Sequence, residues 1–137
     1  MYTKVILAHV GQGKSTRLAQ LVTSDLIKGK KVLFLSTEIN SPEVYLLVNS
    51  QMAVPLLSVR GNLSAGLINN FEKEQLYLRG MKFDVVAYDN PRYESDAVVA
   101  ANIVGAETLY YTKQLNRFVD EVEFVQWDRE NYTLKVK

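Results

Sequence analysis

Short apolar runs alternate with segments of helical periodicity along most of the chain. Four apolar runs have the pattern of strands buried on both faces of a sheet: Lys4–Ala8, Lys31–Ser36, Phe83–Asn90 and Glu107–Thr112. Apolar residues three and four positions apart predict four helices: Lys14 to about Ile27, Ser41 to about Met52, Ala65–Arg79 and Ser95–Val104. This alternation predicts one α/β domain over residues 1–137, with three layers and a mostly parallel sheet.

Capping and turn residues define the expected ends of these helices. Ser41 is the expected N-cap of the second helix, with Pro42 at its first position, and Ser64 is the expected cap of the third. The helices are expected to end at glycines: Gly29, Gly80 and Gly105. Between the second and third helices, Leu57–Val59 is a possible short strand and Gly61–Asn62 a possible turn.

The last part of the chain has a different pattern, in which apolar and polar residues alternate with a period of two. The two alternating segments are Glu121–Trp127 and Tyr132–Val136, and they are separated by a polar stretch. Such a pair predicts a β-hairpin at the carboxyl end of the domain.

A glycine-rich segment lies between the first strand and the first helix. Its sequence is Ala8-His9-Val10-Gly11-Gln12-Gly13-Lys14-Ser15-Thr16. Strand, glycine-rich turn, Lys-Ser and helix is the context of a phosphate-binding loop, in which backbone N–H groups of Val10 to Thr16 surround an anion. Lys14 is expected to reach the β- and γ-phosphates of a nucleotide, and the Ser15 hydroxyl to bind Mg²⁺. Ala8 stands where the pattern has its first glycine, and a chance glycine turn is the alternative.

Three further polar residues follow apolar strands. In a parallel sheet the carboxyl ends of the strands share one edge, so Glu38, Asp89 and Gln114 are expected to meet Gly13 there. Asp89 is the candidate metal ligand and Glu38 the candidate general base that orients an attacking water. Gln114 is the candidate sensor of the γ-phosphate. The alternatives are an Asx turn at Asp89 and solvated loop side chains at Glu38 and Gln114.

Composition excludes several kinds of site. The chain has 137 residues, 47% hydrophobic and 23% charged, with a net charge of +1. It has no Cys and one His, which excludes disulfides, thiolate metal sites and histidine clusters. The small net charge gives no general basic surface for nucleic acid. No signal peptide or membrane span is predicted, and we expect a cytoplasmic protein (in the host cytoplasm if the source is viral) that contacts no membrane.

Three motifs carry a family resemblance. Val32-Leu33-Phe34-Leu35-Ser36-Thr37-Glu38 resembles the strand and S-x-E motif of RecA-like ATPases, above all the hexameric replicative helicases of the DnaB type. Asp84-Val85-Val86-Ala87-Tyr88-Asp89 resembles their Walker B strand, and Lys113-Gln114-Leu115-Asn116-Arg117 is similar to the Q-L-N-R that follows their next strand. With the phosphate loop, the resemblance covers about residues 4 to 137, as a minimal or truncated version.

The resemblance implies ATP and Mg²⁺ as ligands and a role in DNA replication, recombination or packaging. Lys14 and Ser15 then match Walker A residues, Glu38 the catalytic glutamate, Asp89 the Walker B aspartate and Gln114 the residue linking nucleotide state to DNA. It further implies a homo-oligomer and single-stranded DNA as a partner. Either of two basic residues of the final hairpin is a candidate to reach a neighbouring subunit's nucleotide: Arg129 or Lys135.

Two other functions stay open. The intervals after Asp89 and after Arg117 are short for this family, so the chain is alternatively a degenerate module that binds nucleotide, or a helicase or recombinase partner, with little turnover. A small-molecule kinase is the third reading, although no basic lid segment is found. Lys113, Arg117 and Arg92 form a candidate DNA-contacting edge, for which ordinary solvated surface is the alternative.

Overall fold

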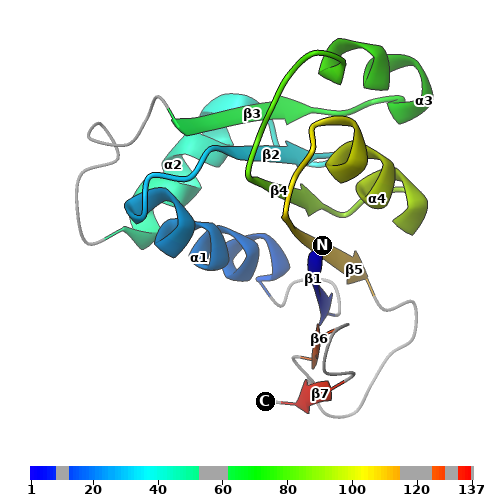
Figure 1. Ribbon diagram of the computed structural model, residues 1–137. Coiled ribbons are helices and arrows are strands. Elements are labelled where there is room, and N and C mark those ends of the chain that lie inside the picture. The colour runs from blue at the N-terminus through cyan, green and yellow to red at the C-terminus, as the bar shows by residue number, and fades with distance from the viewer. Residues whose placement is uncertain (9–12, 53–61, 115–124, 129–132, 137) are drawn as a thin grey trace.

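The computed structural model describes residues 1–8, 13–52, 62–114, 125–128 and 133–136 (Figure 1). In chain order its elements are β1 (Tyr2–Ala8), α1 (Lys14–Ile27), β2 (Val32–Ser36), α2 (Ser41–Gln51), β3 (Leu63–Leu67), α3 (Phe71–Glu74), the 3-10 helix η3 (Gln75–Leu78), β4 (Val85–Asp89), α4 (Glu94–Ile103), β5 (Thr108–Gln114), β6 (Val125–Asp128) and β7 (Thr133–Val136). None of the helices in the described ranges combines the length and the apolar character that a membrane span requires.

Five of the strands form a parallel sheet in the order β3-β2-β4-β5-β1. Helices separate successive strands, as parallel pairing requires. The order places β4 between β2 and β5, so the carboxyl ends of β2, β4 and β5 are neighbours. Beyond β1, β6 and β7 continue the sheet with antiparallel pairing. The connection between β6 and β7 lies outside the described residues, so the hairpin itself stays a prediction.

Helices cover both faces of the parallel sheet, which gives the three layers that the sequence predicts (Figure 1). On one face α1 and α2 pack against Phe34, Val85 and Ala87. On the other face α4 and η3 pack against Leu33 and Val86. Because successive strand residues point to opposite faces and helices cover both faces, β2 and β4 are apolar up to their last residues, Ser36 and Asp89, and all five positions of each are buried.

Most predicted elements are confirmed within one to three residues of their expected ends. This holds for the strands β1, β2, β4 and β5 and for the helices α1, α2 and α4. The three glycines that were expected to end helices, Gly29, Gly80 and Gly105, all have positive φ, which costs glycine little because it has no Cβ. The possible strand at Leu57–Val59 and the possible turn beginning at Gly61 lie outside the described residues.

The helix predicted over Ala65–Arg79 is wrong in its first half. Residues 63–67 form β3, an edge strand parallel to β2, and the helical part is limited to α3 and η3. Gly66 explains part of this, because glycine weakens a helix. Asn70, not Ser64, caps α3 through its contact with the Lys73 N–H.

The start of α2 also differs by one residue from its prediction. Asn40 is the N-cap, and its side chain accepts the Glu43 N–H at 3.1 Å. The predicted cap, Ser41, instead donates its hydroxyl to the Ala65 carbonyl of β3 at 2.7 Å. Tyr45 donates to the Leu63 carbonyl in the same way, at 2.9 Å. Two α2 side chains therefore occupy carbonyls of the edge strand that would otherwise be open to another strand.

Candidate functional site

The amino end of α1 is positioned by a residue with left-handed backbone conformation. Gly13 has φ 72° and ψ 36°, and its carbonyl accepts the Arg17 N–H as the first bond of the helix. The next residues, Lys14, Ser15 and Thr16, begin α1, where N–H groups without helical partners and the helix dipole favour an anion. Val10, Gly11 and Gln12, which were predicted to complete the anion site, lie outside the described residues.

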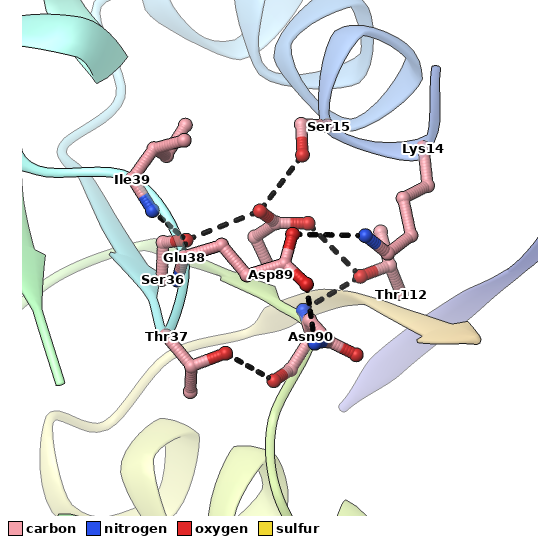
Figure 2. Close-up of polar contacts among 9 residues, drawn as sticks. All are labelled: Lys14, Ser15, Ser36, Thr37, Glu38, Ile39, Asp89, Asn90 and Thr112. Atoms are coloured by element: carbon pink, nitrogen blue, oxygen red, sulfur yellow. Dashed lines mark hydrogen bonds and ion pairs between the residues drawn. The ribbon is translucent and has the colours of Figure 1, made fainter. Parts of the chain in front are cut away.

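Asp89, at the end of β4, is fully buried and accepts hydrogen bonds from three hydroxyl groups (Figure 2). Ser15 donates to its Oδ2 at 2.8 Å, and Ser36 donates to the same oxygen at 3.1 Å. Thr112 donates to Oδ1 at 3.1 Å. The carboxylate thus joins α1, β2 and β5 at one point, and Ser15 and Asp89 are the pair that the sequence proposes as metal ligands.

Backbone N–H groups fix the direction of two of these hydroxyls. The Ser36 oxygen accepts the N–H groups of Glu38 and Ile39, at 3.0 and 3.1 Å, so its proton is left for Asp89. The Thr112 oxygen likewise accepts the Asn90 N–H at 2.7 Å. A hydroxyl has one proton, so accepting elsewhere leaves that proton free to be donated to the carboxylate. Asp89 is therefore held by an oriented set of donors.

Glu38 lies beside this cluster and has a partner on each carboxylate oxygen. Lys14 Nζ donates to Oε2 at 3.0 Å, and Asn90 Nδ2 donates to Oε1 at 2.7 Å. The Lys14 side chain is 11% exposed and that of Glu38 is 41% exposed. A lysine head this close to a carboxylate and this far from solvent is an oriented cation, which would suit an incoming phosphate.

Gln114 lies at the same edge of the sheet but takes no part in the hydrogen bonds described above for Glu38 and Asp89. It ends β5, paired in register with Ala8 of β1, and it lines a cavity of about 560 Å³ together with Asn90 and Thr112. Within the described part of the chain it makes no hydrogen bond to Glu38 or Asp89. The strand order thus brings together Lys14, Ser15, Glu38 and Asp89, and leaves Gln114 at the edge of the group.

The basic residues proposed to contact DNA or a neighbouring subunit's nucleotide either make other contacts or have undescribed side chains. Lys113 pairs with Glu94 at 3.2 Å, and the Arg92 guanidinium lies over the Tyr93 ring at 5.5 Å from its centre. Arg117 and Arg129 lie outside the described residues, and Lys135 is described only as part of β7.

Sequence reasoning missed three residues of this cluster: Ser36, Thr112 and Asn90. Their signal was available, because each stands at or directly after the end of an apolar strand, where Glu38 and Asp89 were found. Ser36 belongs to the S-x-E motif and Asn90 to the possible Asx turn, but the sequence pattern predicts none of the three as a hydrogen-bond partner of Asp89 or Glu38.

The residues fit a Mg²⁺ site of one particular kind. No group of three or more His, Asp or Glu residues gathers anywhere in the described ranges, which argues against a cage made by the protein alone. Mg²⁺ bound to nucleotide phosphates takes only one or two protein side chains, a Ser or Thr hydroxyl and an Asp among them, with phosphate oxygens and waters as its other ligands, and Ser15 with Asp89 could supply such a pair. No protein-family model matches this chain, and no curated protein matches it either.

Proposed function

We propose that this chain is a Mg²⁺-dependent ATPase of the RecA-like P-loop class, similar to the core of DnaB-type helicases. One observation carries the proposal. Lys14 and Ser15, at the amino end of one helix, lie within hydrogen-bond distance of Glu38 and Asp89, which come from the ends of two different strands. Four residue types suited to phosphoryl chemistry thus meet where α/β sheets bind ligands.

The amino end of α1 would bind the phosphates. The first N–H groups of the helix and the Lys14 ammonium supply positive charge, and Lys14 would exchange Glu38 for the β- and γ-phosphate oxygens. Ser15 and Asp89 would hold Mg²⁺. When bound, that ion would supply charge neutralisation on the phosphate oxygens.

Glu38 would act as the general base of hydrolysis. Once Lys14 moves to the phosphates, one oxygen of Glu38 is free to accept a proton from water. The water oxygen then bonds to the γ-phosphorus, the bond from that phosphorus to the β–γ bridging oxygen breaks, and ADP and phosphate leave. Gln114 would respond to the loss of the γ-phosphate from its place at the end of β5.

Partners follow from the proposed class. A replication, recombination or packaging ATPase would act on single-stranded DNA as a homo-oligomer, or with a helicase or recombinase partner. The cavity described above is lined by polar side chains that include Arg92, Lys113 and Gln114. Such a lining supports the binding of a polar ligand beside the proposed nucleotide site. The ion pair of Lys113 with Glu94 argues that this edge contributes little net positive charge.

A nucleotide-binding module without turnover is the second candidate. The observation in its favour is that both carboxylate oxygens of Glu38 are already occupied, by Lys14 and Asn90. If nucleotide binding does not release Lys14 from Glu38, no free base is available. The two candidates therefore differ in hydrolysis and agree in binding.

The test compares nucleotide binding and phosphate release by the purified chain with Mg²⁺, with and without single-stranded DNA. Lys14→Ala should lose nucleotide binding. Glu38→Gln should still bind ATP but hydrolyse it at least about 100-fold more slowly, because a general base usually contributes a rate factor of this size or more. Lys113→Ala and Glu94→Gln are the controls, because they make the same chemical changes in an ion pair outside the cluster. Measured without DNA, both variants should retain nucleotide binding and hydrolysis.

Each result separates the candidates. Binding without turnover in the unaltered chain, whether or not DNA is present, would favour the binding module over the ATPase. If the unaltered chain does not bind ATP at all, both candidates fail.

A further inference from the structure

The backbone of Asn90 has an unusual conformation. Its φ is 52°, and it is the one non-glycine residue of the described chain with positive φ. Asn tolerates this region better than most residues, but the conformation still persists only where the surroundings hold it. Contacts around Asn90 must therefore hold this conformation.

Two neighbouring strands hold the Asn90 backbone in place. Its N–H donates to the Thr112 hydroxyl of β5 at 2.7 Å. Its carbonyl accepts the Thr37 hydroxyl, which follows β2, at 2.7 Å. Because β2 and β5 flank β4, these bonds fix Asn90 from both sides of its strand (Figure 2).

The fixed backbone presents the side-chain amide to Glu38. The distance from Asn90 Nδ2 to Glu38 Oε1 is 2.7 Å, and a carboxylate oxygen there requires the amide nitrogen as donor. This bond and the Lys14 bond lie on different oxygens of Glu38. Phosphates are anions and compete with Glu38 for the Lys14 cation. The Asn90 amide is neutral, so phosphates attract it much less. Asn90 is thus the partner that Glu38 can keep when nucleotide arrives.

We infer that Asn90 is the positioning residue of Glu38: its left-handed backbone, held by Thr37 and Thr112, orients the carboxylate that would accept the proton from water. The inference rests on the proposed ATPase function. The same Thr112 hydroxyl donates to Asp89, so the positions of the general base and the metal ligand are set by one shared residue.

The experiment removes the amide without disturbing the backbone. Asn90→Gly suits φ 52° and keeps the N–H and carbonyl, so the bonds to Thr37 and Thr112 can remain. It should lower kcat for ATP about 10- to 100-fold, the cost of a misplaced catalytic group, with KM and nucleotide binding within about twofold of the unaltered chain. Asn69→Gly is the matched control. Asn69 lines the same cavity as Asn90, of about 560 Å³, but does not contact Glu38, so this variant should change neither kcat nor nucleotide binding.

A double-variant cycle separates positioning from general damage. If Asn90 acts through Glu38, adding Asn90→Gly to Glu38→Gln should lower the residual single-turnover rate no further. A merely structural role would multiply the two losses and would overturn the inference. Should Asn90→Gly not fold, Asn90→Asp keeps the shape, tolerates positive φ and replaces the donor by a carboxylate, and it should lower kcat at least as far.

The outcomes distinguish this inference from the function on which it rests. Turnover in the unaltered chain that Asn90→Gly leaves intact overturns the inference alone and leaves the ATPase standing. Absence of turnover in the unaltered chain overturns both.

Discussion

Lys14 and Glu38 are joined by an ion pair of 3.0 Å between the first residue of α1 and the loop that follows β2. The lysine that would bind phosphate is therefore paired with a carboxylate of the same cluster. A phosphate that binds Lys14 would compete with this carboxylate for the ammonium, so part of the binding free energy would be used to weaken or break the pair.

Glu38→Gln should for this reason bind ATP more tightly than the unaltered chain. A partly exposed ion pair contributes on the order of 0.2–1 kcal/mol, which corresponds to an affinity gain of roughly 1.5- to 5-fold once the competing charge is gone. Titration of ATP with Mg²⁺ by calorimetry would measure it, because the variant hydrolyses slowly.

The control is Glu94→Gln, which breaks the Lys113 ion pair at 3.2 Å and should leave the affinity unchanged. Weaker binding by Glu38→Gln would show that the ion pair does not compete with phosphate.

Most of the fold could be predicted because the buried strands β2 and β4 are apolar at their first four positions, and the helices between them have a clear period. The prediction of a helix at Ala65 was wrong for a physical reason. β3 lies at the edge of the sheet, and only Leu63 of its five residues is buried, so it has no apolar run of its own. Its structure depends on pairing with β2, which no local pattern records.

The candidate site was predicted where it depends on strand ends, and missed where it depends on shared hydrogen bonds. Glu38 and Asp89 follow apolar runs, and parallel pairing alone brings them to one edge. The role of Asn90 depends on its φ of 52° and on hydroxyls of Thr37 and Thr112 that are 53 and 22 residues away in sequence. Sequence suggested only an Asx turn there, because spacing along the chain does not reveal such partners.

Tyr88 and Tyr110 offer a matched pair of buried phenols for a stability test. The Tyr88 hydroxyl has no hydrogen-bond partner among the protein atoms that the structure describes, whereas Tyr110 donates to Asp25 at 2.9 Å. Tyr110→Phe should lower the free energy of unfolding by about 1.5–3 kcal/mol, since a hydrogen bond to a buried carboxylate is lost. Tyr88→Phe loses no such bond and should change it by less than about 1 kcal/mol in either direction.

Urea unfolding at neutral pH, followed by circular dichroism, would compare the two variants. Each replaces one hydroxyl on a strand of the same sheet, so each is the other's control. Equal losses at the two positions would contradict the assignment of partners.

The same two phenols predict how stability changes at alkaline pH. Burial raises the pKa of both Tyr88 and Tyr110, and nearby carboxylates raise it further, Asp96 beside Tyr88 and Asp25 beside Tyr110. In the unfolded chain a phenol titrates near pH 10, so above about pH 10 the unfolded state loses protons that the folded state retains. The free energy of unfolding should then fall as pH rises, by up to about 1.4 kcal/mol per pH unit for each phenol. Below pH 10 both states keep the proton, and neither phenol contributes a slope.

Urea unfolding at a series of pH values above about 10 would measure this slope. Each single Phe variant should remove its own share, and the double variant Tyr88→Phe with Tyr110→Phe should have the flattest profile, because a Phe side chain has no proton to lose. The two shares should add, since the phenols lie on opposite faces of the sheet and belong to different core clusters. If the double variant keeps the full alkaline slope, the proton loss comes from other groups and the raised pKa values of these phenols do not govern alkaline stability.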